Sequence, residues 1–202
     1  MQENLFALLT VFILGLTVGC TPPSIPLDDV TNVETQPNIL LLMTDDMGYT
    51  DLGSFGSEIR TPNLDALALA GLRFINFHAG PACESTRAML MSGTYNRIAG
   101  VVDNSRAPGH LNDSIVTFPE LLQDVGYHTY MAGKWHIGDN EEQSPAAHGF
   151  ESSFALMMGS AGHFSSLGPG EGLPVAHYAE DGQPATLPDD FYSTEFYADR
   201  IL

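Results

Sequence analysis

Residues 80–93 read GPACESTRAMLMSG, and this stretch has the layout of a helix start. A Gly-Pro pair interrupts the preceding segment, Ser85 or Thr86 can cap a helix, and Gly93 suits the position just after a helix end. The stretch therefore predicts that Cys83 lies at or just before a helix N-terminus. Unpaired N–H groups and the helix dipole favour negative charge at that end.

Arg87 follows Cys83 by four residues, roughly one helical turn, so the two side chains can share one helix face. A sulfur nucleophile, an anion-favouring helix end and a forked guanidinium together suit a tetrahedral oxyanion. The alternative is a small buried cysteine at the start of a core helix, with Arg87 in a salt bridge, because free cysteine is among the most buried residue types. These residues alone leave both interpretations open.

Polar residues follow two of the predicted strands. Residues 39–43, ILLLM, form a continuous apolar run that is typical of a strand buried on both faces in a parallel sheet. Residues 127–131 are predicted as another strand, and a third predicted strand precedes the cysteine helix. Ligands bind beyond the carboxyl ends of strands in such sheets, so the polar residues there are expected at one edge. They are Asp45, Asp46, Cys83, Lys134 and His136.

Helical and strand patterns alternate along the rest of the chain, which predicts an α/β fold with a mostly parallel sheet. Residues 164–190 are rich in Gly, Pro and Asp with little periodicity, and we expect an extended loop there. The predicted strands are 39–43, 72–78, 127–131 and 154–158. The predicted helices are 62–70, the cysteine helix up to Gly93, one from the Thr117-x-x-Glu120 capping box to Gly126, and one beginning at Ser193.

The charge balance narrows the range of partners. The 202 residues carry 25 acidic and 7 basic side chains, for a net charge of −18. Nucleic acids and anionic membranes are bound through basic patches, so this composition argues against both as partners. An acidic chain that binds an anion must concentrate its few cations at the site.

The N-terminus resembles an export signal. Residues 5–18 form an apolar run that is shorter than the roughly 20 residues a membrane span needs. The run ends before Cys20 in a segment that resembles a bacterial lipoprotein cleavage box. Residues 1–19 are therefore predicted to be a signal peptide with an atypical start, because residues 1–4 contain no Lys or Arg. A buried N-terminal helix is the alternative. Residues 20–36 are predicted to be a tether. We therefore expect the protein to be secreted or periplasmic, with Cys20 as the candidate lipid attachment site.

Four blocks resemble the type I sulfatases, in the same order along the chain. Residues 83–93 are similar to the family's Cys-x-Pro-Ser-Arg-x-x-x-Leu-Thr-Gly motif, with Ser85 in place of proline. Residues 37–48, PNILLLMTDDMG, resemble its opening strand and metal-binding Asp pair. Residues 126–138, GYHTYMAGKWHIG, resemble its Gly-Lys-Trp-His-Leu-Gly block, and residues 61–65, TPNLD, resemble a helix opening common in the family.

This resemblance, closest to the bacterial arylsulfatases, implies an alkaline-phosphatase/sulfatase-like fold with a mostly parallel sheet between helices. Residues 37–202 would form the N-terminal part of the catalytic domain, truncated at the C-terminus and inactive alone. The implied reaction is hydrolysis of a sulfate ester to an alcohol and sulfate. Two alternatives stay open at this point: a phosphonate monoester or phosphodiester hydrolase of the same superfamily, and a non-catalytic sulfatase-like binding protein.

The resemblance also implies roles for single residues. Cys83 would be converted to formylglycine by the formylglycine-generating enzyme, and its hydrate would attack sulfur. Arg87 would hold the hydrate, Lys134 would contact the sulfate oxygens, and His136 would act as a base.

The same resemblance implies one Ca²⁺ ion, held by Asp45, Asp46 and the modified Cys83. The expected partners are a small-molecule or saccharide sulfate ester and the modifying enzyme. The protein would contact a membrane only through a lipid anchor at Cys20.

Overall fold

We describe the protein from a computed structural model, which divides into two units, residues 1–43 and 44–202. The signal peptide predicted for residues 1–19 and all but the last residue of the tether predicted for 20–36 lie outside the described residues. No helix in the described part of the chain is long and apolar enough to cross a membrane. The described residues are 36–102, 109–164 and 176–202.

The described part of the first unit, residues 36–43, contains no strand. The prediction of a buried strand at residues 39–43 was therefore wrong for this structure. The apolar side chains are exposed, from 38% for Met43 to 79% for Leu40. An apolar run shows only that burial would be favourable. A strand forms only when a neighbouring chain segment pairs with its N–H and C=O groups.

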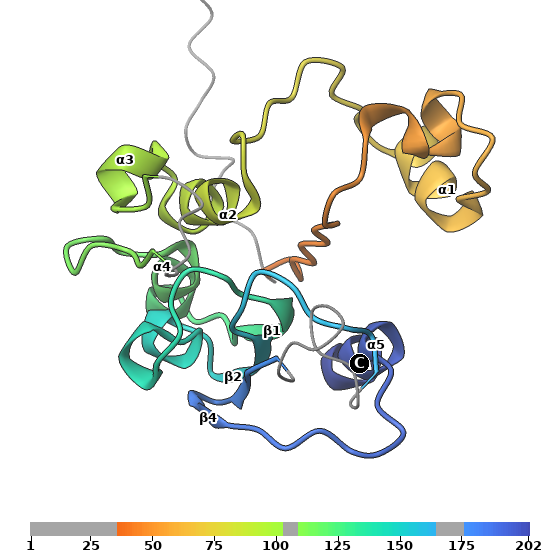
Figure 1. Cartoon of the computed structure of the whole chain (residues 1–202). Coiled ribbons are helices and arrows are strands. Elements are labelled where there is room, and N and C mark those ends of the chain that lie inside the picture. Colours follow the sequence, from red (N-terminus) through yellow and green to blue (C-terminus); the bar gives the residue numbers. More distant parts are fainter. Residues whose placement is uncertain (1–35, 103–108, 165–175) are drawn as a thin grey trace, which may run out of the picture. The chain divides into compact units, whose positions relative to one another are not determined.

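The helices at residues 62–70, 83–92, 118–124 and 193–201 of the second unit lie where local sequence signals predicted them, and the shorter helices were not predicted (Figure 1). Gly93 ends α2 with a φ of 63°, a left-handed conformation that glycine adopts without steric cost. The predicted capping box is also present, because a Glu120 carboxylate oxygen accepts a hydrogen bond from the Thr117 N–H at 2.7 Å. The α-helices are α1 (Pro62–Ala70), α2 (Cys83–Ser92), α3 (Asn96–Ala99), α4 (Phe118–Asp124) and α5 (Ser193–Ile201). The 3₁₀ helices are η2 (Tyr49–Asp51), η3 (Gly53–Phe55), η4 (Glu141–Gln143) and η5 (Ala146–His148).

The described sheet of the second unit contains four strands in the order β1-β2-β3-β4. β1 and β2 pair in parallel, with Tyr130 opposite Ser152 and Lys134 opposite Leu156. The pairings of β2 with β3 and of β3 with β4 are antiparallel. The α/β class is therefore confirmed, and the described sheet is mixed. The strands are β1 (Tyr130–Lys134), β2 (Ser152–Leu156), β3 (Tyr178–Glu180) and β4 (Gln183–Pro184).

The positions of the strands differ from the prediction, and β2 begins two residues before the predicted strand 154–158. β1 begins three residues later than the predicted strand 127–131, which makes Lys134 its last residue. Residues 72–78 form no strand, and their large apolar side chains are exposed. The predicted loop 164–190 contains the β3–β4 hairpin, whose turn consists of Asp181 (φ 49°) and Gly182 (φ 83°). An Asp-Gly pair is a strong hairpin signal, so this turn was visible in the sequence.

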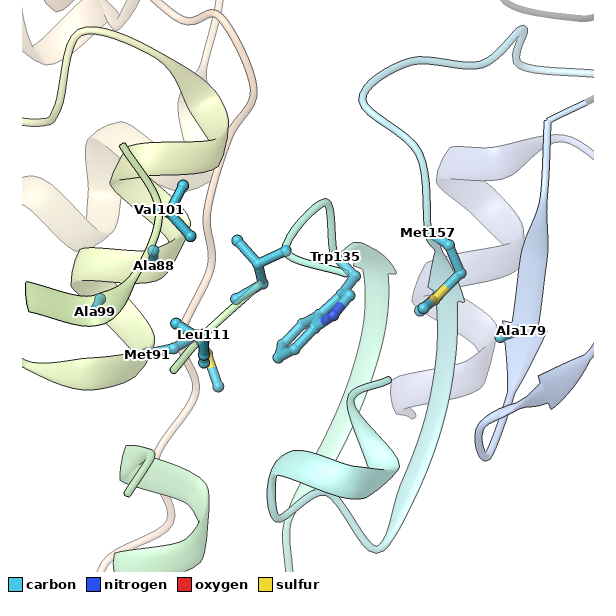
Figure 2. Packing of buried hydrophobic residues seen from close by; sticks show 10 residues of the cluster. Ala88, Met91, Ala99, Val101, Leu111, Trp135, Met157 and Ala179 are labelled. Atoms are coloured by element: carbon cyan, nitrogen blue, oxygen red, sulfur yellow. The ribbon is translucent and has the colours of Figure 1, made fainter. Parts of the chain in front are cut away.

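The apolar interior of the second unit forms two clusters. Trp135 is the largest member of the first cluster, where Figure 2 shows its indole with Leu111 and Met157. The same cluster includes Ala88 and Met91 of α2, so the helix that begins at Cys83 and the strand that ends at Lys134 share one core. The second cluster is mainly aromatic and links β2 and β3 to α5. Its buried members are Phe154, Leu156, Ala176, Tyr178 and Phe191.

Candidate active site

Cys83 is the first residue of α2 and is half-buried. The sequence predicted this position but not the cap. Ala82 is the N-cap residue, and the hydroxyl of Ser85 donates instead to the Ala82 carbonyl at 2.9 Å. The Thr86 hydroxyl likewise donates to the Gly80 carbonyl at 3.2 Å. These bonds tie the first turn of the helix to the segment before it and fix the direction in which Cys83 leaves the backbone.

Asp45, Arg87 and Lys134 form one network, although 89 residues separate its most distant members. The ammonium group of Lys134 lies 2.9 Å and 3.1 Å from the two carboxylate oxygens of Asp45. Arg87 lies 3.4 Å from the same carboxylate and also donates to the Lys134 backbone carbonyl. The cationic side chains are 12% and 10% exposed for Arg87 and Lys134, whereas Asp45 is 47% exposed. Two largely buried cations thus share one carboxylate that is open to solvent.

This arrangement holds Asp45 in its ionised form. Burial alone raises the pKa of Asp45, but the hydrogen bond and charge of Lys134, together with the charge of Arg87, outweigh burial and lower it. The network carries a net charge of +1 when all three groups are ionised. In a chain whose overall charge is −18, this is a local site for an anion.

His136 faces Cys83. It lies two residues beyond the end of β1 and takes a left-handed backbone conformation with a φ of 59°, which is uncommon for a residue other than glycine. Its side chain is buried, and its Nδ1 lies 3.4 Å from the Cys83 sulfur. The left-handed turn redirects the chain after the strand, and the imidazole meets the first residue of α2 as a result.

The imidazole of His136 is neutral at pH 7. Burial, followed by the positive charges of Lys134 and Arg87, lowers its pKa to about 4. The nearby carboxylate of Asp45 opposes this shift without reversing it. A buried neutral imidazole has a free lone pair, and it can therefore accept a proton from a group at position 83.

This pKa predicts an acid-sensitive contribution to stability. The native pKa is about 4 and the usual value is 6.5, so folding favours the neutral imidazole. The contribution is complete above pH 6.5 and is lost as the pH falls toward 4. We expect His136→Asn to reduce the loss of unfolding free energy between pH 7 and pH 4.5, as measured by urea denaturation. His128→Asn is the matched control, because it removes an exposed imidazole. If the unfolding free energies of the wild type and of His136→Asn fall by the same amount between pH 7 and pH 4.5, the prediction is wrong.

The donor set tests the predicted calcium site. Asp45 and Asp46 offer oxygen ligands of the type that Ca²⁺ takes, but Ca²⁺ needs six to eight of them. The carboxylate of Asp45 is paired with Lys134 and Arg87. Within the described ranges, no group of three or more His, Cys, Asp or Glu side chains is placed to hold a metal. The described residues therefore do not by themselves fit a calcium ion.

The structure brings five of the six predicted site residues together. Asp46 is the exception: it lies next to Asp45 in a left-handed conformation (φ 55°) and is exposed. The five that meet are Asp45, Cys83, Arg87, Lys134 and His136. Gly159 was not predicted as part of the site, and a Cβ atom built on it would lie 2.6 Å from Nε2 of the His136 ring. A lone glycine between apolar and small residues gave no signal of that contact.

Comparisons with known proteins agree on one family. The family model described as Sulfatase matches residues 37–201. An arylsulfatase of Klebsiella aerogenes is 38% identical over 179 residues, which cover 83% of this chain and 39% of that protein. The solved structure of Ps i-CgsB superposes with a TM-score of 0.69 at 28% identity, covering 80% of this chain and 39% of the other.

A further solved structure contains a bound substrate. The protein in that structure, which is in complex with its substrate D-glucosamine-2-N,6-O-disulfate, superposes on this chain with a TM-score of 0.66 at 30% identity. The alignment covers 83% of this chain and 30% of that protein. The chain thus spans between about a quarter and two fifths of the length of the curated relatives it matches.

Proposed function

This chain belongs to the sulfatase family, and from that membership we propose that it supplies the N-terminal part of a domain that hydrolyses a sulfate ester to an alcohol and sulfate. One observation carries the proposal. Four of the five residues that meet in the structure are those to which the family resemblance gives the roles of the nucleophile, its partners and the sulfate contact. The contact between Cys83 and His136 joins positions 53 residues apart in the sequence.

The electrostatics of the site suit this substrate class. A sulfate monoester carries a single negative charge at neutral pH, and the Asp45–Arg87–Lys134 network carries a net charge of +1. Arg87 and Lys134 are held by Asp45 and by each other, so they need little reorganisation when an anion binds. Both are nearly buried, which strengthens their attraction for an anion relative to cations in bulk water.

His136 would move the proton in this reaction. Its Nδ1 faces position 83 at 3.4 Å, and its low pKa keeps it neutral and able to accept a proton. We propose that Cys83 is converted to formylglycine, which when hydrated supplies a hydroxyl nucleophile. The imidazole is placed to take a proton from a hydroxyl at this position and to hold it on Nδ1.

Ser85 stands where the family motif has proline, and the backbone accommodates either residue. Ser85 is the third residue of α2, and the first helical hydrogen bond of this helix is made by the N–H of Thr86 to Ala82. The N–H of Ser85 is one that a helix leaves without an internal partner, so the absence of an N–H in proline costs nothing there. The segment around Cys83 therefore keeps a helical first turn with serine at this position.

The calcium ion stays part of the proposal, with Asp45 and Asp46 as its first ligands. Further oxygen ligands are needed in addition to these two carboxylates, and none of the steps above depends on the ion. We also propose a secreted or periplasmic location with Cys20 as the anchor site, on the strength of the N-terminal sequence alone. Fractionation of the native cells tests this: recovery of the protein in the cytoplasm contradicts it.

The function is tested on the full-length protein from its native host. We expect mass spectrometry of the tryptic peptide 74–87 to show that residue 83 has lost its sulfur and carries an aldehyde. We expect the same preparation to hydrolyse an aryl sulfate much faster than the matching aryl phosphate. A plain thiol at residue 83 together with no sulfate release would overturn the proposal. Ser85→Pro is the matched variant, and it shows whether a plain thiol results from the serine.

A further inference from the structure

We propose that Gly159 is a positioning residue for the His136 imidazole: its missing side chain leaves the space in which the ring stands. This inference rests on the proposed function for its kinetic consequence, but its structural part is independent of the reaction. Gly159 follows β2 by three residues and lies in no helix or strand.

The contact is specific to the ring. A Cβ atom built on Gly159 would lie 2.6 Å from Nε2 and 2.7 Å from Cε1 of His136, closer than real Cβ atoms come to other heavy atoms. The backbone of Gly159 is not in the left-handed region, so alanine is compatible with its conformation. The obstacle to a side chain is therefore the imidazole and not the backbone.

The ring has two close neighbours. Its Nε2 and Cε1 atoms are those nearest to a Cβ built on Gly159, while its Nδ1 lies 3.4 Å from the Cys83 sulfur. The left-handed backbone at His136 fixes the direction in which the side chain leaves the chain. A Cβ at position 159 would push the ring toward residue 83 or out of line with it. Either movement changes the distance over which a proton passes.

The segment that carries Gly159 is fixed at its far end. His163 Nδ1 lies 2.7 Å from the Ser193 hydroxyl, and the Ser193 N–H donates to the His163 carbonyl at 3.0 Å. A bridge between Phe164 and Tyr192 adds to this attachment. The segment is thus held against the start of α5 and cannot easily move away to relieve a clash. The space beside His136 therefore belongs to the fixed structure of this segment.

The experiment compares Gly159→Ala with Ser160→Ala, an exposed neighbour in the same segment. In the full-length protein we expect Gly159→Ala to lower kcat by about 100-fold, the scale of a displacement near 1 Å, and to leave KM within about twofold. Ser160→Ala should leave both unchanged. In a His136→Ala background, Gly159→Ala should cost no more than about twofold, because the ring it displaces is gone.

A second measurement does not depend on activity. We expect the NMR signals of the His136 ring to shift in Gly159→Ala and to stay in place in Ser160→Ala. Unchanged ring signals in Gly159→Ala would overturn the inference, as would an equal loss of kcat with and without the His136 side chain. Shifted ring signals in a protein that hydrolyses no sulfate ester would support the positioning role and count against the proposed function alone.

Discussion

Replacing Cys83 with alanine in the full-length protein is expected to abolish sulfate ester hydrolysis, with a fall in kcat on the order of 10⁵-fold. The reason is chemical: Cys83 is the proposed source of the nucleophile, and alanine supplies neither a thiol nor an aldehyde. The loss exceeds that expected from Gly159→Ala, which only displaces a group that assists the nucleophile. Steady-state kinetics with an aryl sulfate measures it.

The control separates a lost nucleophile from a damaged fold. Cys83 is half-buried at the end of a helix, so we expect Cys83→Ala to keep the circular dichroism spectrum and the melting temperature close to wild type. Leu90→Ala on the same helix changes an exposed side chain and should retain activity. If Cys83→Ala keeps more than about a tenth of the wild-type kcat, the residue is not the nucleophile.

The largest loss of stability is expected from Trp135→Ala, at about 3–5 kcal/mol of unfolding free energy. Trp135 is 2% exposed, its indole stacks on His148 with the ring centroids 5.7 Å apart, and it meets Phe150 edge-on at 6.4 Å. The indole N–H also donates to the Gln143 carbonyl at 2.8 Å. Alanine removes the packing and the hydrogen bond together, and a typical domain has only about 5–15 kcal/mol to lose.

Urea denaturation of the full-length protein followed by far-UV circular dichroism measures this loss, because this signal does not depend on the indole that the variant removes. Trp135→Phe is the matched variant. It keeps most of the buried area and leaves the Gln143 carbonyl without its donor, so we expect an intermediate loss of about 1–3 kcal/mol. A cost below about 1 kcal/mol for Trp135→Ala would contradict the packing seen around the indole.

Trp135 also connects the core to the site. It lies between Lys134 and His136 in the sequence, and its backbone N–H donates to the Leu156 carbonyl of β2 at 2.8 Å. The side chains on either side of it therefore depend on how firmly the indole is held. The burial of one aromatic residue thus contributes to the position of two polar ones.

The helices could be predicted from the sequence because their signals are local. The helix predicted at 62–70 is α1 with the same limits, and Gly93 ends α2 as expected. Each backbone hydrogen bond in an α-helix joins residues that are four apart. Helix propensities and capping residues within about ten residues are therefore enough to predict the helix. The predictions of strands at 39–43 and 72–78 were wrong for the opposite reason. Apolar runs and alternation show which face could be buried but do not supply the segment that pairs with it.

The sequence by itself identified the residues of the proposed site: the cysteine at a helix start, the arginine one turn later, and the lysine and histidine near the end of a strand. Those assignments rest on residue type, spacing and four family blocks. Only the tertiary structure decided that Lys134 pairs with Asp45 and that Gly159 leaves room for His136. The first of these contacts joins residues that are 89 positions apart in the sequence, and the second joins residues that are 23 positions apart. Both depend on how strands and helices pack, because spacing along the chain does not encode the distance between two side chains that meet across a fold.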